Sequence, residues 1–168
     1  MNIFDDFTRK VLVELNEAGV IYLIVGGYAV NFHGFRRTTG DIDIWLKPEN
    51  EENKKRLMIV FTKLGCTPEF LNEVEQLDFS QPLLISDGEE PYKIDFLTSI
   101  SGVKFEDAWK ERQTTEIEGI LLHFIHYNHL ILSKITSSRL KDKMDIETLQ
   151  RIRKIKNEGE EKNKDDNK

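Results

Sequence analysis

Residues 41–46 read DIDIWL, an alternation that begins as a β-strand does, yet two of its positions are aspartate. Aspartate is among the residues most depleted from strands. Side chains two residues apart on a strand point to one face, about 6.5 Å apart along it. Asp41 and Asp43 therefore stand side by side as like charges, with Ile42 and Ile44 on the opposite face. An exposed polar strand explains such a pair, and so does a cation site.

The composition predicts a single soluble domain. The chain has 168 residues, and 39% of them are hydrophobic. Its one cysteine, Cys66, excludes an internal disulfide framework and suits a reducing cytoplasm. The N-terminus lacks the basic and apolar regions of a signal peptide. The apolar run VIYLIV (20–25) is far shorter than the ~20 residues that span a bilayer. We therefore expect a cytoplasmic protein with no membrane contact.

The charge is distributed unevenly along the chain. Residues 134–156 carry eight Lys/Arg against three Asp/Glu, whereas residues 1–133 carry thirteen against twenty-two. An acidic body with one basic segment repels polyanions in general but can still hold a phosphate locally. Non-specific nucleic-acid binding needs a broader basic face, so this class of function is disfavoured.

Apolar periodicity predicts alternating helices and strands with no internal repeat. Helices are predicted at 3–18, 28–34, 50–64, 105–110, 127–137 and 141–156. Strands are predicted at 20–25 and 41–46, as a pair within 76–85 and 92–97, and as a hairpin within 114–125. The fold class that follows is α+β, a small mixed β-sheet flanked by helices. We expect one domain over 1–156, with 126–156 as its C-terminal helical part, and a disordered charged tail at 157–168.

Three features near the two aspartates favour the cation site. Gly26 and Gly27 stand between a predicted buried strand and a helix, where glycine lets a phosphate approach backbone N–H groups closely. Asp95 lies in the apolar strand YKIDFL, where a carboxylate is costly unless a cation compensates it. Arg36 and Arg37 closely precede the aspartates and suit either a phosphate or the carboxylates themselves.

Three carboxylates from two strands form an oxygen-rich site of the kind that suits Mg²⁺, with Mn²⁺ as the alternative. Two such ions about 3.5–4 Å apart promote in-line phosphoryl or nucleotidyl displacement. We therefore expect Asp41, Asp43 and Asp95 to bind metal, with two ions in the site.

The stretch LIVGGYAVNFHGFRRTTGDIDIWL (23–46), followed by YKIDFL (92–97), resembles the signature of the DNA polymerase beta-like nucleotidyltransferase superfamily. That signature is a hydrophobic strand, Gly-Gly or Gly-Ser opening a helix, an Asp-x-Asp strand and a later strand aspartate. Within it, the chain is most similar to the small prokaryotic minimal and AbiEii-toxin-like nucleotidyltransferases. A second stretch, HLILSKITSSRLKDKMDIETL (129–149), is similar to that family's late Lys…Arg…Lys-Asp…Asp pattern.

The resemblance implies a nucleotidyltransferase fold with C-terminal helices and a role for each matching residue. Asp41, Asp43 and Asp95 would be catalytic and hold Mg²⁺, and Asp95 would also orient or deprotonate the acceptor hydroxyl. The nucleotide-binding residues would be Gly26, Gly27, Arg37, Lys134 and Arg139, with Asp142 and Asp145 in support. Many relatives have serine where this chain has Gly27, so one phosphate contact is missing here.

The expected activity is metal-dependent transfer of an NMP from an NTP to a hydroxyl acceptor. The acceptor is a protein side chain, a tRNA 3′ end or a small molecule such as an aminoglycoside, and the toxin-like resemblance favours a macromolecule in a toxin–antitoxin or phage-defence setting. The small chain suits a homo-oligomer or a partner protein such as an antitoxin. Two alternatives stay open: a catalytically silent nucleotide-binding or protein-interaction module of the same fold, and metal-dependent phosphoester hydrolysis.

Other residues are expected to have structural roles. His123, His126 and His129 recur at intervals of three, but His123 lies in a predicted strand, so zinc binding is disfavoured. His33 and Trp45 lie near the candidate site, where contact with the nucleotide is the alternative to a structural role in the core.

Overall fold

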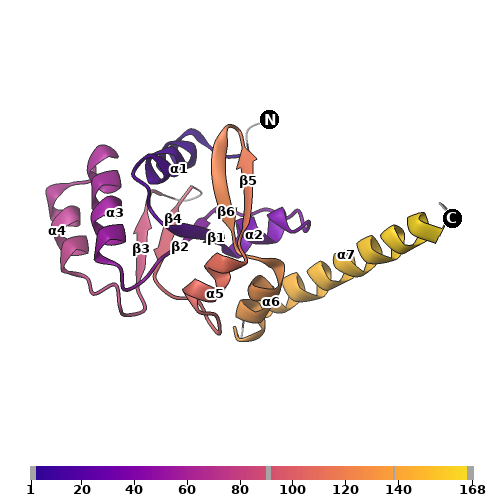
Figure 1. The fold of residues 1–168 in the computed structure, drawn as a ribbon. Helices are drawn as coiled ribbons and strands as arrows, with labels where there is room; N and C mark the ends of the chain where they lie inside the picture. The colour runs from indigo at the N-terminus through magenta and orange to yellow at the C-terminus, as the bar shows by residue number, and fades with distance from the viewer. Residues whose placement is uncertain (1–2, 90–91, 138, 166–168) are drawn as a thin grey trace.

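The computed structural model describes residues 3–89, 92–137 and 139–165, and it has the α+β fold that the sequence predicts (Figure 1). One mixed sheet holds six strands in the order β3-β4-β2-β1-β6-β5. Their bounds are β1 Tyr22–Val25, β2 Ile42–Leu46, β3 Leu84–Asp87, β4 Ile94–Leu97, β5 Gln113–Ile117 and β6 Ile120–Phe124.

The sheet combines both strand directions. Antiparallel pairs join β1 to β2, β3 to β4 and β5 to β6, while β4 runs parallel to β2 and β6 runs parallel to β1. Every residue of the central strand β1 is buried. Because a central strand is covered on both faces, its sequence is continuously apolar rather than alternating.

Seven helices surround the sheet in the described part of the chain. They are α1 Asp6–Glu17, α2 Gly26–Phe32, α3 Glu51–Lys63, α4 Pro68–Gln76, α5 Phe105–Lys110, α6 Tyr127–Ile135 and α7 Leu140–Asp165. Side-chain caps begin several of them: Asp5 accepts from the backbone N–H groups of Phe7 and Thr8 at α1, and Asn50 accepts from that of Asn53 at α3.

The segment before β3 differs from the prediction. A strand was expected within 76–85, but α4 occupies 68–76 and β3 begins only at Leu84. The signal for α4 is local, because Thr67 caps the helix by accepting from the N–H of Phe70 and Pro68 occupies its first turn.

The two faces of the sheet have different neighbours. On one face Phe96 of β4 packs against Phe61 of α3, with ring centroids 5.2 Å apart. On the other face Trp45 of β2 packs edge-on against Phe105 of α5 at 5.0 Å. Asp43 shares this second face with Trp45, so α5 covers one end of the face and leaves the aspartate end for the site.

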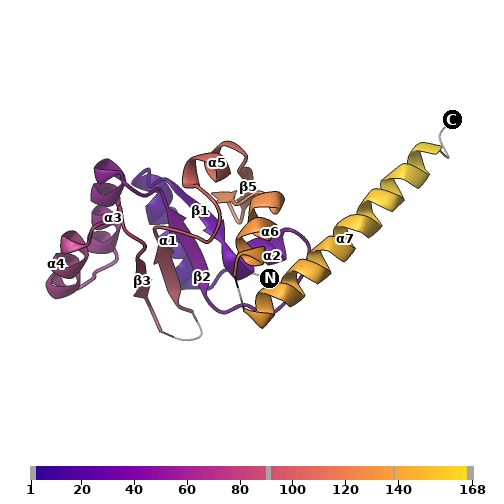
Figure 2. The same cartoon turned by 90° about the horizontal axis from the view of Figure 1, so that it is seen from below.

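The helix α7 extends away from the sheet in both views (Figures 1 and 2). It continues to Asp165 and crosses residue 156 without a break, over part of the range 157–168 for which the sequence predicts a disordered tail. Adding residues to an existing helix requires no apolar contact, and Glu and Lys are good helix formers. Lys154 and Glu158 also form an i,i+4 ion pair at 3.9 Å. A single domain over 1–156 stays a prediction.

None of the helices in the described ranges has the length and apolar character needed to cross a membrane.

Candidate active site

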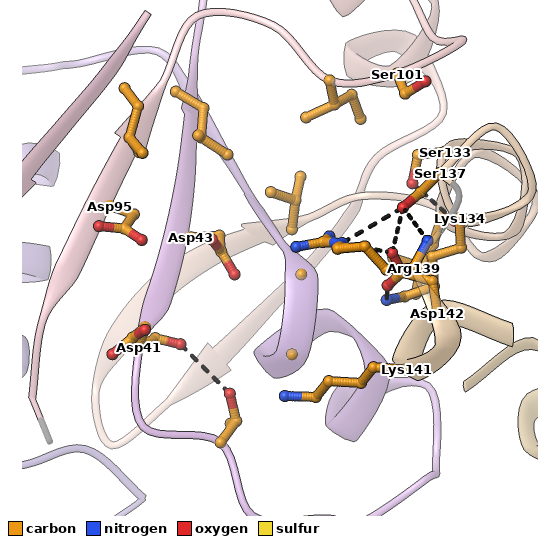
Figure 3. Close-up of a pocket in the computed structure, with 18 of the residues that line it drawn as sticks. Asp41, Asp43, Asp95, Ser101, Ser133, Lys134, Ser137, Arg139, Lys141 and Asp142 are labelled. Carbon is orange, nitrogen blue, oxygen red and sulfur yellow. Dashed lines mark hydrogen bonds and ion pairs between the residues drawn. The ribbon is translucent and has the colours of Figure 1, made fainter. Parts of the chain in front are cut away.

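A cavity of about 700 Å³ opens at the aspartate end of the sheet. Figure 3 shows Asp41, Asp43 and Asp95 on one side of it and residues of the α6–α7 region on the other. All eight residues that the sequence predicts for the site line this one cavity: Gly26, Gly27, Arg37, Asp41, Asp43, Asp95, Lys134 and Arg139.

Strand register brings the carboxylates together. In the parallel pair β2–β4, Asp43 stands directly opposite Asp95, and Ile42 stands opposite Ile94. Directly opposed residues project their side chains to one face of a sheet. Asp41 comes immediately before β2 and lies two residues from Asp43, which directs it to the same face.

Gly26 sits against the Asp43 carboxylate. Its φ of +60° lies in the left-handed region, and a Cβ built there would collide with the Asp43 carboxylate, standing 2.7 Å from Cγ. Only glycine meets both conditions without a shift of the aspartate. Gly27 is the second residue of α2, and the hydrogen bond from its backbone N–H works to lower the pKa of Asp43.

The net effect on Asp43 is nevertheless a raised pKa. Burial is the largest cause, followed by the nearby charges of Asp95 and Asp41, and these outweigh the opposing effects of the Gly27 N–H and the Arg139 charge. Desolvation and like charges both disfavour the ionised form of a carboxyl group. Ionised Asp43 is therefore disfavoured mainly by its burial and further by the two neighbouring carboxylates.

Asp41 and Asp95 share one positive neighbour. The Lys93 ammonium lies 3.9 Å from Asp41 Oδ2 and 3.6 Å from Asp95 Oδ1. The Ser86 hydroxyl also donates to Asp95 Oδ1 at 2.6 Å, because Ser86 is the register partner of Asp95 in β3–β4. Within 3–89, 92–137 and 139–165, no group of three His, Cys, Asp or Glu side chains is arranged to hold a metal ion.

The chemistry of this wall still fits a divalent cation. Asp41 Oδ1 is buried and has no hydrogen-bond partner among the described residues. A buried carboxylate oxygen without a partner carries a desolvation cost that a bound cation would offset. Together with Asp43 and Asp95, Asp41 forms the hard, all-oxygen donor set that Mg²⁺ and Mn²⁺ prefer.

The opposite wall rests on a buried network of charges. Asp145 accepts two hydrogen bonds from Arg37, at 2.8 Å from Nε and 3.0 Å from Nη2. The Lys134 ammonium donates to Asp145 Oδ2 at 2.8 Å and to Asp142 Oδ1 at 2.7 Å, and its side chain is only 7% exposed. This network ties the loop before β2 to both C-terminal helices. The prediction that Arg37 and Lys134 contact a nucleotide stays a prediction, and here both are engaged with carboxylates.

Arg139 is held differently. Its Nε donates to Asp142 Oδ2 at 2.9 Å, but the side chain is 79% exposed. Burial works to raise the pKa of Asp142, but hydrogen bonds from Lys134 and Ser137 outweigh it and lower the pKa to about 2. Asp142 is thus ionised at neutral pH and binds Arg139 through Nε. The two terminal nitrogens of the Arg139 guanidinium are left to face the cavity.

Sequence reasoning missed a group of hydroxyl and lysine side chains in the same cavity. They are Thr39, Ser99, Ser101, Ser133, Thr136, Ser137 and Lys141. Two signals were available. Ser99 and Ser101 lie two and four residues after the end of β4, the strand that carries Asp95. Thr39 lies within TTGDID, two residues before Asp41.

The histidines and the tryptophan for which the sequence predicts structural roles contact other parts of the protein. His33 Nε2 donates to the carbonyl oxygen of Ile125 at 2.8 Å, and burial is the main cause that lowers the His33 pKa. Trp45 is 1% exposed and packs in the core. His123 lies in β6, as predicted, and hydrogen-bonds Thr114 at 2.8 Å, whereas His126 caps α6 by accepting from the N–H of Asn128.

Comparison with known proteins places these features in a family. Residues 5–166 match the family described as "Nucleotidyl transferase of unknown function (DUF2204)". The structure is similar to the crystal structure of the lincosamide antibiotic adenylyltransferase LnuA with lincomycin bound, with a TM-score of 0.52, 15% sequence identity, and coverage of 89% of this chain and 98% of that chain. At that identity the likeness concerns the fold. A search of curated proteins gives no match.

Proposed function

The chain belongs to a family of nucleotidyl transferases, and on that premise we propose that it transfers an NMP from an NTP to a hydroxyl acceptor with the help of divalent metal ions. The observation that carries the proposal is the register of Asp43 opposite Asp95 beside Asp41, whose buried Oδ1 has no hydrogen-bond partner among the described residues. Such an arrangement costs stability unless it serves a cation.

In the proposed reaction, the acceptor hydroxyl oxygen attacks the α-phosphorus and the bond to pyrophosphate breaks. Asp95 orients the hydroxyl and takes its proton. Mg²⁺ or Mn²⁺ held by the three aspartates would supply Lewis-acid stabilisation of the charge on the phosphates. Arg139 and Lys141, which line the far wall, would bind the phosphate oxygens.

Two classes of acceptor are proposed for this site. The toxin-like resemblance favours a protein side chain or a tRNA 3′ end, and a toxin–antitoxin or phage-defence role with it. The fold it shares with a lincosamide antibiotic adenylyltransferase makes a small-molecule hydroxyl the second class to test. A cavity of about 700 Å³ is in the range of small-molecule sites.

The test is a thermal-unfolding series with each of the four NTPs, with and without Mg²⁺. A ligand at 100 times its Kd stabilises a protein by about 2.7 kcal/mol, which is several degrees for a domain of this size. We expect a Mg²⁺-dependent shift in the wild type and none in Asp43→Asn. Asp107→Asn is the matched control, because Asp107 is an exposed carboxylate that does not line the cavity.

The product then separates the alternatives. Release of pyrophosphate on adding an acceptor supports transfer, whereas release of inorganic phosphate alone would identify a phosphoester hydrolase. The second candidate is a nucleotide-binding module without transfer activity, favoured by the lack of a ready three-ligand group among the described residues. Binding of Mg²⁺-NTP without either product, across protein, RNA and antibiotic acceptors, would select that candidate.

A further inference from the structure

The hydroxyl group of Ser86 contacts the aspartate that takes a proton in the proposed reaction. Ser86 stands directly opposite Asp95 in the antiparallel pair β3–β4, and its hydroxyl donates to Asp95 Oδ1 at 2.6 Å. Leu84, two residues earlier in β3, lines the cavity, and residues two apart on a strand share a face. Ser86 therefore faces the cavity side of the sheet and makes the contact with Asp95 that the reaction requires of an acceptor hydroxyl.

The position of Ser86 leaves room for a bulky product. Ser86 is exposed, and β3 is the first strand in the sheet order, with β4 as its one neighbour. A group attached to the Ser86 oxygen can therefore extend into solvent beyond the edge of the sheet. A serine in a central strand such as β1, where every residue is buried, could not carry a nucleotide.

Ser137, on the opposite wall, has a similar contact but an unsuitable partner. Its hydroxyl donates to Asp142 Oδ2 at 2.5 Å, and Asp142 also accepts from Lys134 and Arg139. A carboxylate held as an anion by two cations is a poor proton acceptor. Among the described residues, Ser86 carries the one side-chain hydroxyl that hydrogen-bonds to a carboxylate oxygen of the three site aspartates.

We propose that Ser86 is an internal acceptor, so that the chain transfers an NMP to its own Ser86 hydroxyl. The Ser86 oxygen attacks the α-phosphorus of the NTP, the bond from that phosphorus to pyrophosphate breaks, and Asp95 takes the hydroxyl proton. The products are pyrophosphate and a phosphodiester that joins Ser86 to the nucleoside. This inference rests on the proposed function, because it uses the same NTP, the same metal ions and the same aspartates.

The modification limits itself. Once the Ser86 oxygen is esterified, it has no proton to donate to Asp95, and a negative phosphodiester stands beside the carboxylates. Like charges at this distance repel each other, so a second Mg²⁺-NTP binds less well to the modified site. We therefore expect at most one NMP on each chain and a smaller Mg²⁺-NTP thermal shift in the modified protein.

The experiment incubates the full chain with Mg²⁺ and the NTP that gives the largest thermal shift, with no other acceptor present. Intact-protein mass spectrometry measures the mass increase, and fragmentation of the peptides locates it. Ser86→Ala removes the hydroxyl, and Ser86→Thr keeps one on a residue that suits a strand. Ser80→Ala is the matched control, because Ser80 is an exposed serine six residues earlier that does not line the cavity.

A second readout separates loss of the acceptor from damage to the site. An α,β-methylene NTP binds but cannot be cleaved between the α- and β-phosphorus atoms, so its Mg²⁺-dependent thermal shift reports binding alone. We expect Ser86→Ala to keep this shift, because its side chain supplies no phosphate contact. The same variant should lose the mass increase, while Ser86→Thr regains part of it and Ser80→Ala keeps all of it.

The expected result is a mass increase of one NMP that fragmentation places on Ser86. An NMP placed on another residue, or an undiminished mass increase in Ser86→Ala, would overturn the inference. Pyrophosphate release with an external acceptor, but no mass increase of the chain itself, would overturn the inference and leave the proposed function standing. A wild type with no Mg²⁺-NTP thermal shift would overturn both together.

Discussion

Gly26 and Asp43 form a contact that excludes any larger residue at position 26. Gly26 has φ +60°, and a Cβ built on it would collide with the Asp43 carboxylate. The glycine that begins α2 and the aspartate in the middle of β2 therefore require each other. The lack of a side chain at position 26 therefore makes room for the Asp43 carboxylate, whether or not a phosphate also approaches the loop.

We expect Gly26→Ala to abolish the Mg²⁺-NTP thermal shift, because the added methyl group displaces the Asp43 carboxylate. Left-handed strain adds a destabilisation of roughly 1–2 kcal/mol, measurable by urea unfolding. Gly65→Ala is the matched control, since Gly65 has φ +83° with no atom within 4 Å of its built Cβ. It carries the same strain and should keep the thermal shift. Loss of the shift in both variants would contradict the contact as the cause.

Gly27 and Thr39 form a second close pair. A Cβ built on Gly27 would stand 2.9 Å from the Thr39 Cβ and closer still to its hydroxyl. Thr39 therefore fills the space that a side chain at position 27 would need. A serine at position 27, which the sequence comparison with the nucleotidyltransferase signature raises, would therefore clash with Thr39 in this arrangement.

We expect Gly27→Ser to destabilise the protein and the double variant Gly27→Ser/Thr39→Gly to lose less stability than the sum of the two single changes. Residues in contact show coupling energies of about 0.5–3 kcal/mol in such cycles. Urea unfolding of the four proteins measures the coupling. Additive changes would mean that the loop around Thr39 moves aside freely.

Local order in the sequence explains why the predicted site residues gather around one cavity. Residues 22–46 contain β1, α2, a loop and β2 in this order. The side-chain period of a strand places Asp41 and Asp43 on one face. Since β4 pairs with β2 in the register that opposes Asp95 to Asp43, the third carboxylate joins them. All eight predicted residues consequently line one cavity.

Tertiary pairing explains what could not be predicted. Asp145 is eleven residues from Lys134 and 108 from Arg37, and nothing local indicates that one carboxylate binds both. The role of Ser86 likewise depends on the β3–β4 register. The helix over 157–165 differs from the disorder predicted there, because low hydrophobicity indicates disorder only where no helix is already present to extend.

Asp43 should make metal-free stability depend on pH in a definite direction. Its folded-state pKa is raised by burial and by the charges of Asp95 and Asp41, so the folded state binds the proton more tightly than the unfolded state. Stability therefore falls as pH rises from the unfolded value near 3.8 through the folded value. We expect Asp43→Asn in EDTA to unfold at a higher temperature than the wild type at pH 7, with the difference shrinking toward pH 4.

Thermal scans in EDTA from pH 4 to pH 8 measure this difference, with Asp107→Asn as the control that should follow the wild type. An Asp43→Asn protein less stable than the wild type at pH 7 would mean that the hydrogen bond from Gly27 outweighs the repulsion, contrary to the direction of the Asp43 pKa.

The buried network at Asp145 should dominate the stability of the C-terminal wall. Asp145 is 1% exposed and accepts from Arg37 and Lys134, so Asp145→Asn leaves the buried Lys134 and the partly buried Arg37 short of negative charge. We expect a loss of about 3 kcal/mol or more in the free energy of unfolding by urea. Glu147→Gln is the matched control two residues along α7, where the side chain is exposed, and it should change stability by less than about 0.5 kcal/mol.

The same two variants separate a structural role from nucleotide binding. Because Asp145 holds Arg37 and Lys134 in the cavity wall, the Mg²⁺-NTP shift should weaken in Asp145→Asn at a temperature where the variant is still folded. High salt should leave the stability difference between Asp145→Asn and the wild type largely intact, since buried pairs are screened much less than exposed ones. A difference that disappears in high salt would show that the network is open to solvent and that α7 does not dock on the loop before β2 in the way its contacts indicate.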